Sequence, residues 1–196
     1  MMMNKTALLT ACAAAALLVG CAHGTSPASG TAMAAPGTKM VGGAPMYPAK
    51  DIVDNAVNSS DHTTLVAAVK AAGLVETLKG PGPFTVFAPT NAAFSSLPAG
   101  TVDTLLKAEN KPVLTKVLTY HVVPGRLDGA ALAQQIQAGG GRAALRTVSG
   151  DMLTASMMGP NIVVRDAKGA TAAVTISDVY QSNGVIHVVD KVLLPG

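Results

Sequence analysis

Two histidines, His121 and His187, carry the most versatile chemistry in this 196-residue chain. An imidazole titrates near neutral pH, and its neutral form ligates metals. Either ring is therefore suited to a pH-sensitive contact, and the two rings together with Asp178 or Asp190 are suited to a metal site. Metal ligands usually recur at short spacings, and these residues do not. We expect each ring to hydrogen-bond a backbone carbonyl or a carboxylate within the domain, and we expect no bound metal and no cofactor.

Other residue patterns that support catalysis are incomplete. The only glutamates, Glu76 and Glu109, fall on predicted helix surfaces, which argues against a paired-carboxylate hydrolase. The glycine pattern at 139–141 follows a predicted helix, whereas a dinucleotide loop follows a strand. Three methionines, Met152, Met157 and Met158, offer soft copper ligands. Strand alternation instead predicts that Met152 is a packed residue, and the other two are expected in an exposed turn. No G-x-S-x-G motif occurs. The sequence predicts a protein that is not an enzyme.

The beginning of the chain has the pattern of an export signal. Residues 1–20 combine one lysine with an apolar stretch that is too short to span a bilayer as a helix, so they are predicted to be a signal peptide. The letters LVGC at 18–21 resemble a bacterial lipobox. This resemblance implies that Cys21 receives a lipid and becomes the first mature residue, in the outer membrane if the cell is Gram-negative; ordinary secretion is the alternative. Cys12 leaves with the signal, so no internal disulfide is expected.

Residues 21–45 are predicted to form a flexible tether, because Gly, Ala, Ser, Thr and Pro dominate them without an apolar period. Residues 46–196 are then the folded domain. The formal charge of +3 falls to +2 once Lys5 is removed, and the chain has no Trp and only six Phe and Tyr in total. A nucleic-acid-binding protein is therefore not expected.

Helical periodicity dominates the first part of the domain, between residues 51 and 136. Asp61, Asn91 and Asp128 are predicted N-caps of helices, and Gly73 is a predicted C-terminal stop. Two exceptions interrupt the helices, a strand at 84–88 and a strand entry at 120–123.

After Gly141 the apolar period changes to two, and segments rich in Val, Ile and Thr alternate with turn sequences. The predicted strands are 144–148, 152–157, 162–165, 172–176 and 185–192. Helices followed by a strand meander indicate an α+β domain rather than alternating β-α-β units.

Three segments together resemble the signature boxes of the fasciclin (FAS1) domain. They are FTVFAPTNAAF at 84–94, TYHVVPG at 119–125 and NGVIHVVDKVLLP at 183–195. Their order and separation match the family, and the resemblance covers about residues 46–195. It implies a single FAS1-like domain, in which a twisted β-sandwich or wedge is flanked by short helices.

The resemblance also assigns roles to residues. The family's proposed receptor contacts imply a partner-binding site at Tyr120, His121, Val122 and Val123, although an apolar strand is equally often core. The motif residues expected to have structural roles are Phe87, Thr90, Asn91, Phe94, Asn183, Gly184, His187 and Asp190. Asn183 and Gly184 are expected to provide a positive φ at the entry to the last strand.

Together, these features predict the function of the chain. The chain is expected to be a monomeric adhesion or interaction module of the cell envelope, with no catalytic activity, held to the membrane by the lipid on Cys21. Its expected partner is an envelope or extracellular protein or polysaccharide. The alternative is a carrier of a small ligand, such as a pigment, haem or glycan, with a cleft near Tyr120 and His121.

Overall fold

A computed structural model of the chain describes residues 37–196. The predicted signal peptide, Cys21 and residues 22–36 of the predicted tether lie outside the described residues. The described helices are α1 (Ile52–Ala56), α2 (Thr63–Ala72), α3 (Val75–Lys79), α4 (Asn91–Ser95), α5 (Thr101–Leu106), α6 (Lys111–Tyr120) and α7 (Gly129–Ala138), with 3-10 turns at Ser60–His62 and Ala108–Asn110. The described strands are β1 (Lys39–Val41), β2 (Ala44–Met46), β3 (Phe84–Pro89), β4 (Val122–Pro124), β5 (Arg142–Arg146), β6 (Met152–Met158), β7 (Asn161–Arg165), β8 (Thr171–Gln181) and β9 (Gly184–Val189).

Capping residues determine where several helices begin and end. Asp128 caps α7 by accepting a backbone hydrogen bond of 2.8 Å, and Gly73 ends α2 in the left-handed conformation, as predicted. Two other predicted caps are wrong. Asp61 lies within the 3-10 turn before α2, and Asn91 is the first residue of α4, whose N-cap is Thr90.

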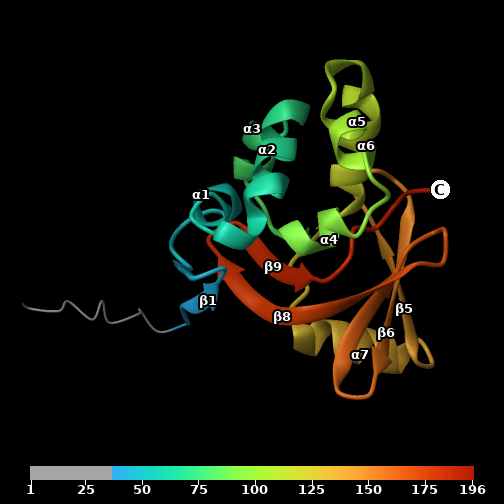
Figure 1. The fold of residues 1–196 in the computed structure, drawn as a ribbon. Helices are drawn as coiled ribbons and strands as arrows, with labels where there is room; N and C mark the ends of the chain where they lie inside the picture. The colour runs from blue at the N-terminus through green and yellow to red at the C-terminus, as the bar shows by residue number, and fades with distance from the viewer. Residues whose placement is uncertain (1–36) are drawn as a thin grey trace, which may run out of the picture. The chain divides into compact units, whose positions relative to one another are not determined.

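The strands β3 to β9 form one sheet in the order β4-β3-β9-β8-β7-β6-β5. Figure 1 labels β9, β8, β6 and β5 of this sheet. The pair β3–β9 is parallel and the other pairs are antiparallel. One end of β8 pairs with β7, and the rest of this strand pairs with β9. Two register shifts interrupt the pairing with β9, and such irregularities bend a strand, so β8 divides the sheet into two halves. The two edges approach each other, because the Val148 N–H donates to the Val122 carbonyl at 2.8 Å. The predicted α+β wedge is confirmed.

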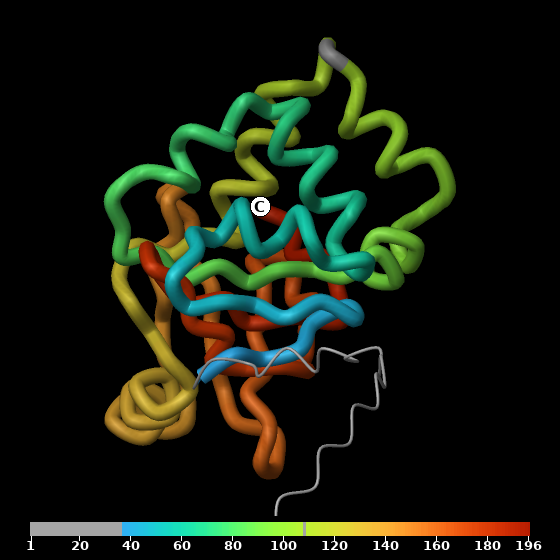
Figure 2. The backbone as a smooth tube through the Cα atoms, turned by 90° about the vertical axis from the view of Figure 1, so that its left-hand side faces the viewer, coloured from blue at the N-terminus to red at the C-terminus, as the bar shows by residue number. Residues whose placement is uncertain are grey.

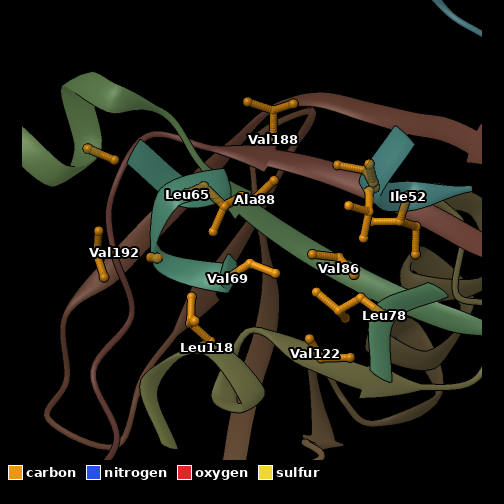
Figure 3. Close-up of a cluster of buried hydrophobic side chains, with 14 of the residues drawn as sticks. Ile52, Leu65, Val69, Leu78, Val86, Ala88, Leu118, Val122, Val188 and Val192 are labelled. Carbon is orange, nitrogen blue, oxygen red and sulfur yellow. The ribbon is translucent and has the colours of Figure 1, made fainter. Parts of the chain in front are cut away.

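Two hydrophobic cores lie on opposite faces of the sheet. The helices α1 to α6 cover one face, and α7 packs against the half-sheet of β5 and β6 on the other side (Figure 1). Strand β3 serves both cores, since Val86 and Ala88 point into the first and Phe87 into the second. Phe94 also lies in the first core, part of which is drawn in Figure 3.

The folded domain begins earlier than residue 46. Strands β1 and β2 form a hairpin in which Val41 and Met46 are 3% and 2% exposed and belong to the first core. The hairpin lies beside β8 (Figure 2). Lys39 Nζ in the hairpin donates to the Ser177 carbonyl of β8. The predicted tether boundary at 45 is therefore wrong. Each of these strands spans three residues, too few to show an apolar period in the sequence.

The entry to β9 also differs from the sequence prediction. Neither Asn183 nor Gly184 has a positive φ. Gly184 instead pairs with Phe84 in the parallel register, and a Cβ there would overlap the Phe84 carbonyl oxygen. The close approach of two backbones, rather than a turn conformation, requires glycine at this position.

Substitution of Gly184 by alanine is expected to lower the free energy of unfolding by about 3 kcal/mol, because neither backbone of the central parallel pair has room for a methyl group. Gly140→Ala is the matched control. Gly140 has φ +66° and nothing within 4 Å of the position of a Cβ, so it tests left-handed strain alone, at about 1 kcal/mol. Urea unfolding measures both variants, and equal losses would contradict the overlap at Gly184.

Candidate functional site

The three sequence boxes meet at the centre of the sheet, on Phe87 of β3. The Phe87 N–H donates to the carbonyl of His121 at 2.9 Å. On the other side of β3, Phe87 pairs with His187 in the parallel register, and the two rings stack with their centroids 5.6 Å apart. Residues separated by up to one hundred positions in the chain therefore form one cluster.

Tyr120 connects the end of α6 to the second half of the sheet. Its side chain is fully buried, and its hydroxyl donates to the carbonyl of Met152 at 3.0 Å. The same oxygen accepts the N–H of Ala167 at 2.9 Å. Burial raises the pKa of this phenol, so it stays protonated and keeps both bonds.

His121 connects the same end of α6 to the C-terminal segment. Its Nε2 accepts the Leu193 N–H at 2.9 Å, so Nδ1 carries the proton and donates to the Val117 carbonyl at 2.8 Å. Protonation of Nε2 would place two N–H groups against each other. Burial lowers the pKa of this ring to about 4, despite the opposing effects of the Val117 carbonyl and of Asp166.

His187 holds the loop that precedes α7. Its Nε2 donates to the Leu127 carbonyl at 2.7 Å, and its Nδ1 faces the Asp178 N–H at 3.4 Å. Asp178 has a positive φ of 57° and accepts the N–H of Gly129 at the start of α7. Burial lowers the pKa of His187, and the Leu127 carbonyl and the Asp178 carboxylate oppose this shift.

The two motif asparagines, Asn91 of α4 and Asn183 of the turn between β8 and β9, stabilise the ends of other helices. Asn91 accepts the Thr64 N–H at 3.0 Å in the first turn of α2. Asn183 accepts the Ile52 N–H of α1 at 3.1 Å and donates to the Leu78 carbonyl of α3 at 2.7 Å. Each amide thus satisfies helix-end groups that would otherwise lack partners.

The remaining motif residues also contact backbone groups or the core. Thr90 Oγ1 accepts the N–H of Ala93 at 3.3 Å, and Phe94 packs in the first core. Asp190, which directly follows β9 in the last box, accepts the N–H of Ala173 in β8 at 2.7 Å. These contacts all lie within the domain.

The comparisons with known proteins agree with this arrangement. The fasciclin domain model matches residues 60–195.

The chain belongs to the fasciclin domain family.

"Protein sll1483" of Synechocystis sp. is 50% identical over 147 residues, which cover 75% of this chain and 74% of that protein. "Cell surface glycolipoprotein MPB83" of Mycobacterium bovis is 31% identical over 195 residues, covering 87% of this chain and 79% of its own. A solved FAS1 domain pair from the insect cell adhesion molecule fasciclin I matches with a TM-score of 0.55 and 23% identity, over 66% of this chain and 43% of that one. This last likeness supports the fold.

The fasciclin domain does not present its Tyr-His box to solvent. Tyr120, His121, Val122 and Val123 are between 0% and 6% exposed, so the expectation that these side chains contact a partner needs correction. The physical reason is that the two rings hold α6 to other segments, and the two valines lie in different cores. These four side chains are therefore not on the surface of the folded domain.

Sequence reasoning missed one buried carboxylate of the fasciclin domain, Asp166. It is 6% exposed and accepts the N–H groups of Lys168, Ala170 and Leu194 at 3.0, 2.8 and 3.0 Å. The first two bonds form an Asx-type turn, which an aspartate at the start of a turn sequence can indicate. The bond to Leu194 has no signal in the local sequence.

An apolar cavity of about 60 Å³ lies beside His121. Side chains from α1, α2, α3, α6, β3 and β4 line it, and Figure 3 shows several of them, including Val69, Leu78, Leu118 and Val122. A cavity of about 150 Å³ binds benzene, so this one in its present form has room for a smaller group only.

The imidazoles of His121 and His187 in the fasciclin domain have no ring nitrogen left over for a metal ion. Both ring nitrogens of His121, and both of His187, face backbone groups, as expected from the sequence. Within residues 37–196, no group of three or more His, Cys, Asp or Glu residues is placed to hold a metal ion. In the same part of the chain, no helix has the length and apolar character needed to cross a membrane.

Acidification from about pH 6.5 to about pH 4 is expected to destabilise the domain. The unfolded chain has histidine pKa values of about 6.5, whereas burial lowers that of His121 to about 4. In this window the unfolded state binds a proton that the folded state excludes, so stability falls as the pH falls. The His121 contribution is about 3 kcal/mol, measurable by urea unfolding.

His62 and His187 act in the same direction, because burial lowers both pKa values. His121→Gln should be less stable at neutral pH but lose less stability on acidification. A His121 ring signal that titrates above about pH 6 in NMR would contradict the buried neutral imidazole.

Proposed function

We propose that this chain is an exported adhesion or interaction module of the cell envelope, without catalytic activity. The observation that carries the proposal is the fasciclin match over residues 60–195. It is supported by one relative named as a cell surface glycolipoprotein and by a fold shared with a cell adhesion molecule. The partner is an envelope or extracellular protein or polysaccharide, and nucleic acid is not a partner.

The proposed attachment to the membrane is through a lipid on Cys21, after removal of residues 1–20. The glycolipoprotein relative aligns with 87% of this chain, which supports a shared arrangement. The domain acts as a monomer at the outer membrane of a Gram-negative cell, or as a secreted protein if Cys21 is not modified.

We propose no catalytic activity because the buried polar side chains already bond groups inside the domain. Tyr120, His121 and His187 bond backbone groups inside the domain. Glu76 and Glu109 are exposed on α3 and on the 3-10 turn before α6, and they do not form a pair with each other.

Replacement of Cys21 by serine is expected to move the protein from the membrane fraction to the soluble fraction, because it removes the thiol that carries the lipid. Cell attachment should then fall to the level of cells that lack the protein. Fractionation and attachment to a surface, both in the native host, measure the two effects.

Cys12→Ser is the matched control and should leave both readouts unchanged. Retention of Cys21→Ser in the membrane would contradict the lipid anchor. Equal attachment by wild-type cells and by cells that lack the protein would contradict the adhesion function.

A second candidate function is the binding of a small apolar ligand in the cavity beside His121. The apolar lining favours this ligand class over haem or a glycan. A pigment would require the helices around the cavity to separate, since the present volume is about 60 Å³.

Native mass spectrometry of the protein from its own host tests this candidate and should show an added mass that organic solvent removes. Leu118→Phe, which fills the cavity, should abolish the added mass; Val113→Phe, on the exposed side of α6, is the control. Protein that carries no added mass would exclude the candidate.

A further inference from the structure

Three of the four arginines of the chain lie on the outer face of the half-sheet formed by β5, β6 and β7. Arg142 and Arg146 are exposed in β5, and Arg165 is exposed in β7. The pairing register places Arg142 opposite Ser156, Arg146 opposite Met152 and Thr154 opposite Arg165. Directly paired residues share one face of a sheet, so the three guanidinium groups belong to the same surface.

No acidic residue within the described strands β5, β6 and β7 offsets this charge. Among residues 37–196, the side chains of Arg142 and Arg146 form no hydrogen bond or ion pair, and Arg165 uses only Nε, on the Gly169 carbonyl. The nearest carboxylates in the sequence are engaged elsewhere. Asp151 pairs with Lys116 at 3.4 Å, and Asp166 accepts backbone N–H groups.

The same face is hollowed by an open groove of about 360 Å³. Val163, which is 5% exposed, lies at its base, and Met158, which is 61% exposed, lies at one side. The polar lining consists of Arg142, Thr154, Ser156, Arg165 and Thr171. Met152, predicted as a packed residue, is instead 48% exposed on this face, because the alternation of β6 turns it outward.

We propose that this groove binds an acidic polysaccharide through its carboxylate groups. The inference rests on the proposed function, since it names the partner class and the surface. Strand spacing puts the backbone positions of Arg142 and Arg165 about 12 Å apart, because they are separated by two strand spacings and by two residues along the strands. The backbone positions of Arg142 and Arg146 are about 13 Å apart along β5. A chain with repeated carboxylates can place one carboxylate against each guanidinium group at such spacings.

The chemistry of the groove favours a glycan over other polyanions. The hydroxyls of Thr154, Ser156 and Thr171 can hydrogen-bond sugar hydroxyls, and Val163 with Met158 offers apolar contact to a sugar ring. No aromatic side chain lines the groove on which a nucleic acid base would stack. The aromatic anchors typical of a protein interface are likewise not among its lining residues.

Binding of the purified full chain to polygalacturonate, with neutral dextran as the comparison, tests the proposal by calorimetry. Wild-type protein should bind polygalacturonate, more weakly as salt rises, and should not bind dextran. The double variant Arg142→Gln/Arg165→Gln should bind roughly tenfold more weakly or worse. The control Lys107→Gln/Lys111→Gln removes two charges from exposed residues elsewhere and should retain binding within about twofold.

Three results would overturn the proposal: no binding to polygalacturonate, equal losses in the arginine and lysine variants, or tighter binding of poly-L-glutamate, which would indicate an acidic protein partner. Circular dichroism confirms that each variant is folded, and Arg146→Gln provides a second test if the double variant is not. The assay uses isolated protein and a defined glycan, so its failure is distinct from a failure of cell attachment in the host.

Discussion

The fold depends on the hydrogen bonds that two consecutive side chains at the end of α6, Tyr120 and His121, form with backbone groups. The hydroxyl of Tyr120 and both ring nitrogens of His121 bond backbone groups of β6, of the β7–β8 turn, of α6 itself and of the C-terminal segment. Neither cysteine of the chain lies in residues 37–196, so these hydrogen bonds connect distant segments where a small exported domain often has disulfides.

This constraint separates the scaffold of the domain from its binding surface. A side chain that satisfies buried backbone groups cannot leave them for a partner without leaving those groups unpaired, which costs more than a typical contact returns. The motif residues are therefore fixed by the interior. The outer strand faces, such as the arginine-bearing groove over β5 to β7, carry no such internal duty and can contact a partner without unpairing buried groups.

The sequence predicted the parts of the fold that depend on local patterns. The order of helices and strands, the cap at Asp128 and the stop at Gly73 follow from neighbours in the chain. Errors arose where a partner is distant. Asn91 caps α2 from another helix, and Gly184 is required by the backbone of β3.

The candidate site was predictable only in part, for the same reason. The boxes drew attention to residues that form contacts inside the domain, but burial of the Tyr-His box depends on segments far away in the sequence. The arginine face did have a local signal, since Arg142 and Arg146 alternate with the apolar residues of β5. That Arg165 lies on the same face could be seen only from the pairing register of β5, β6 and β7.

The position of β9 has a consequence for the order of events in folding. It is the last strand in the chain, yet it lies between β3 and β8, and its first residue pairs with Phe84, one hundred residues earlier. Neither core can close until this strand has been synthesised and inserted. Such a late, long-range step makes folding slow, and it leaves the earlier strands with open edges until the final residues arrive.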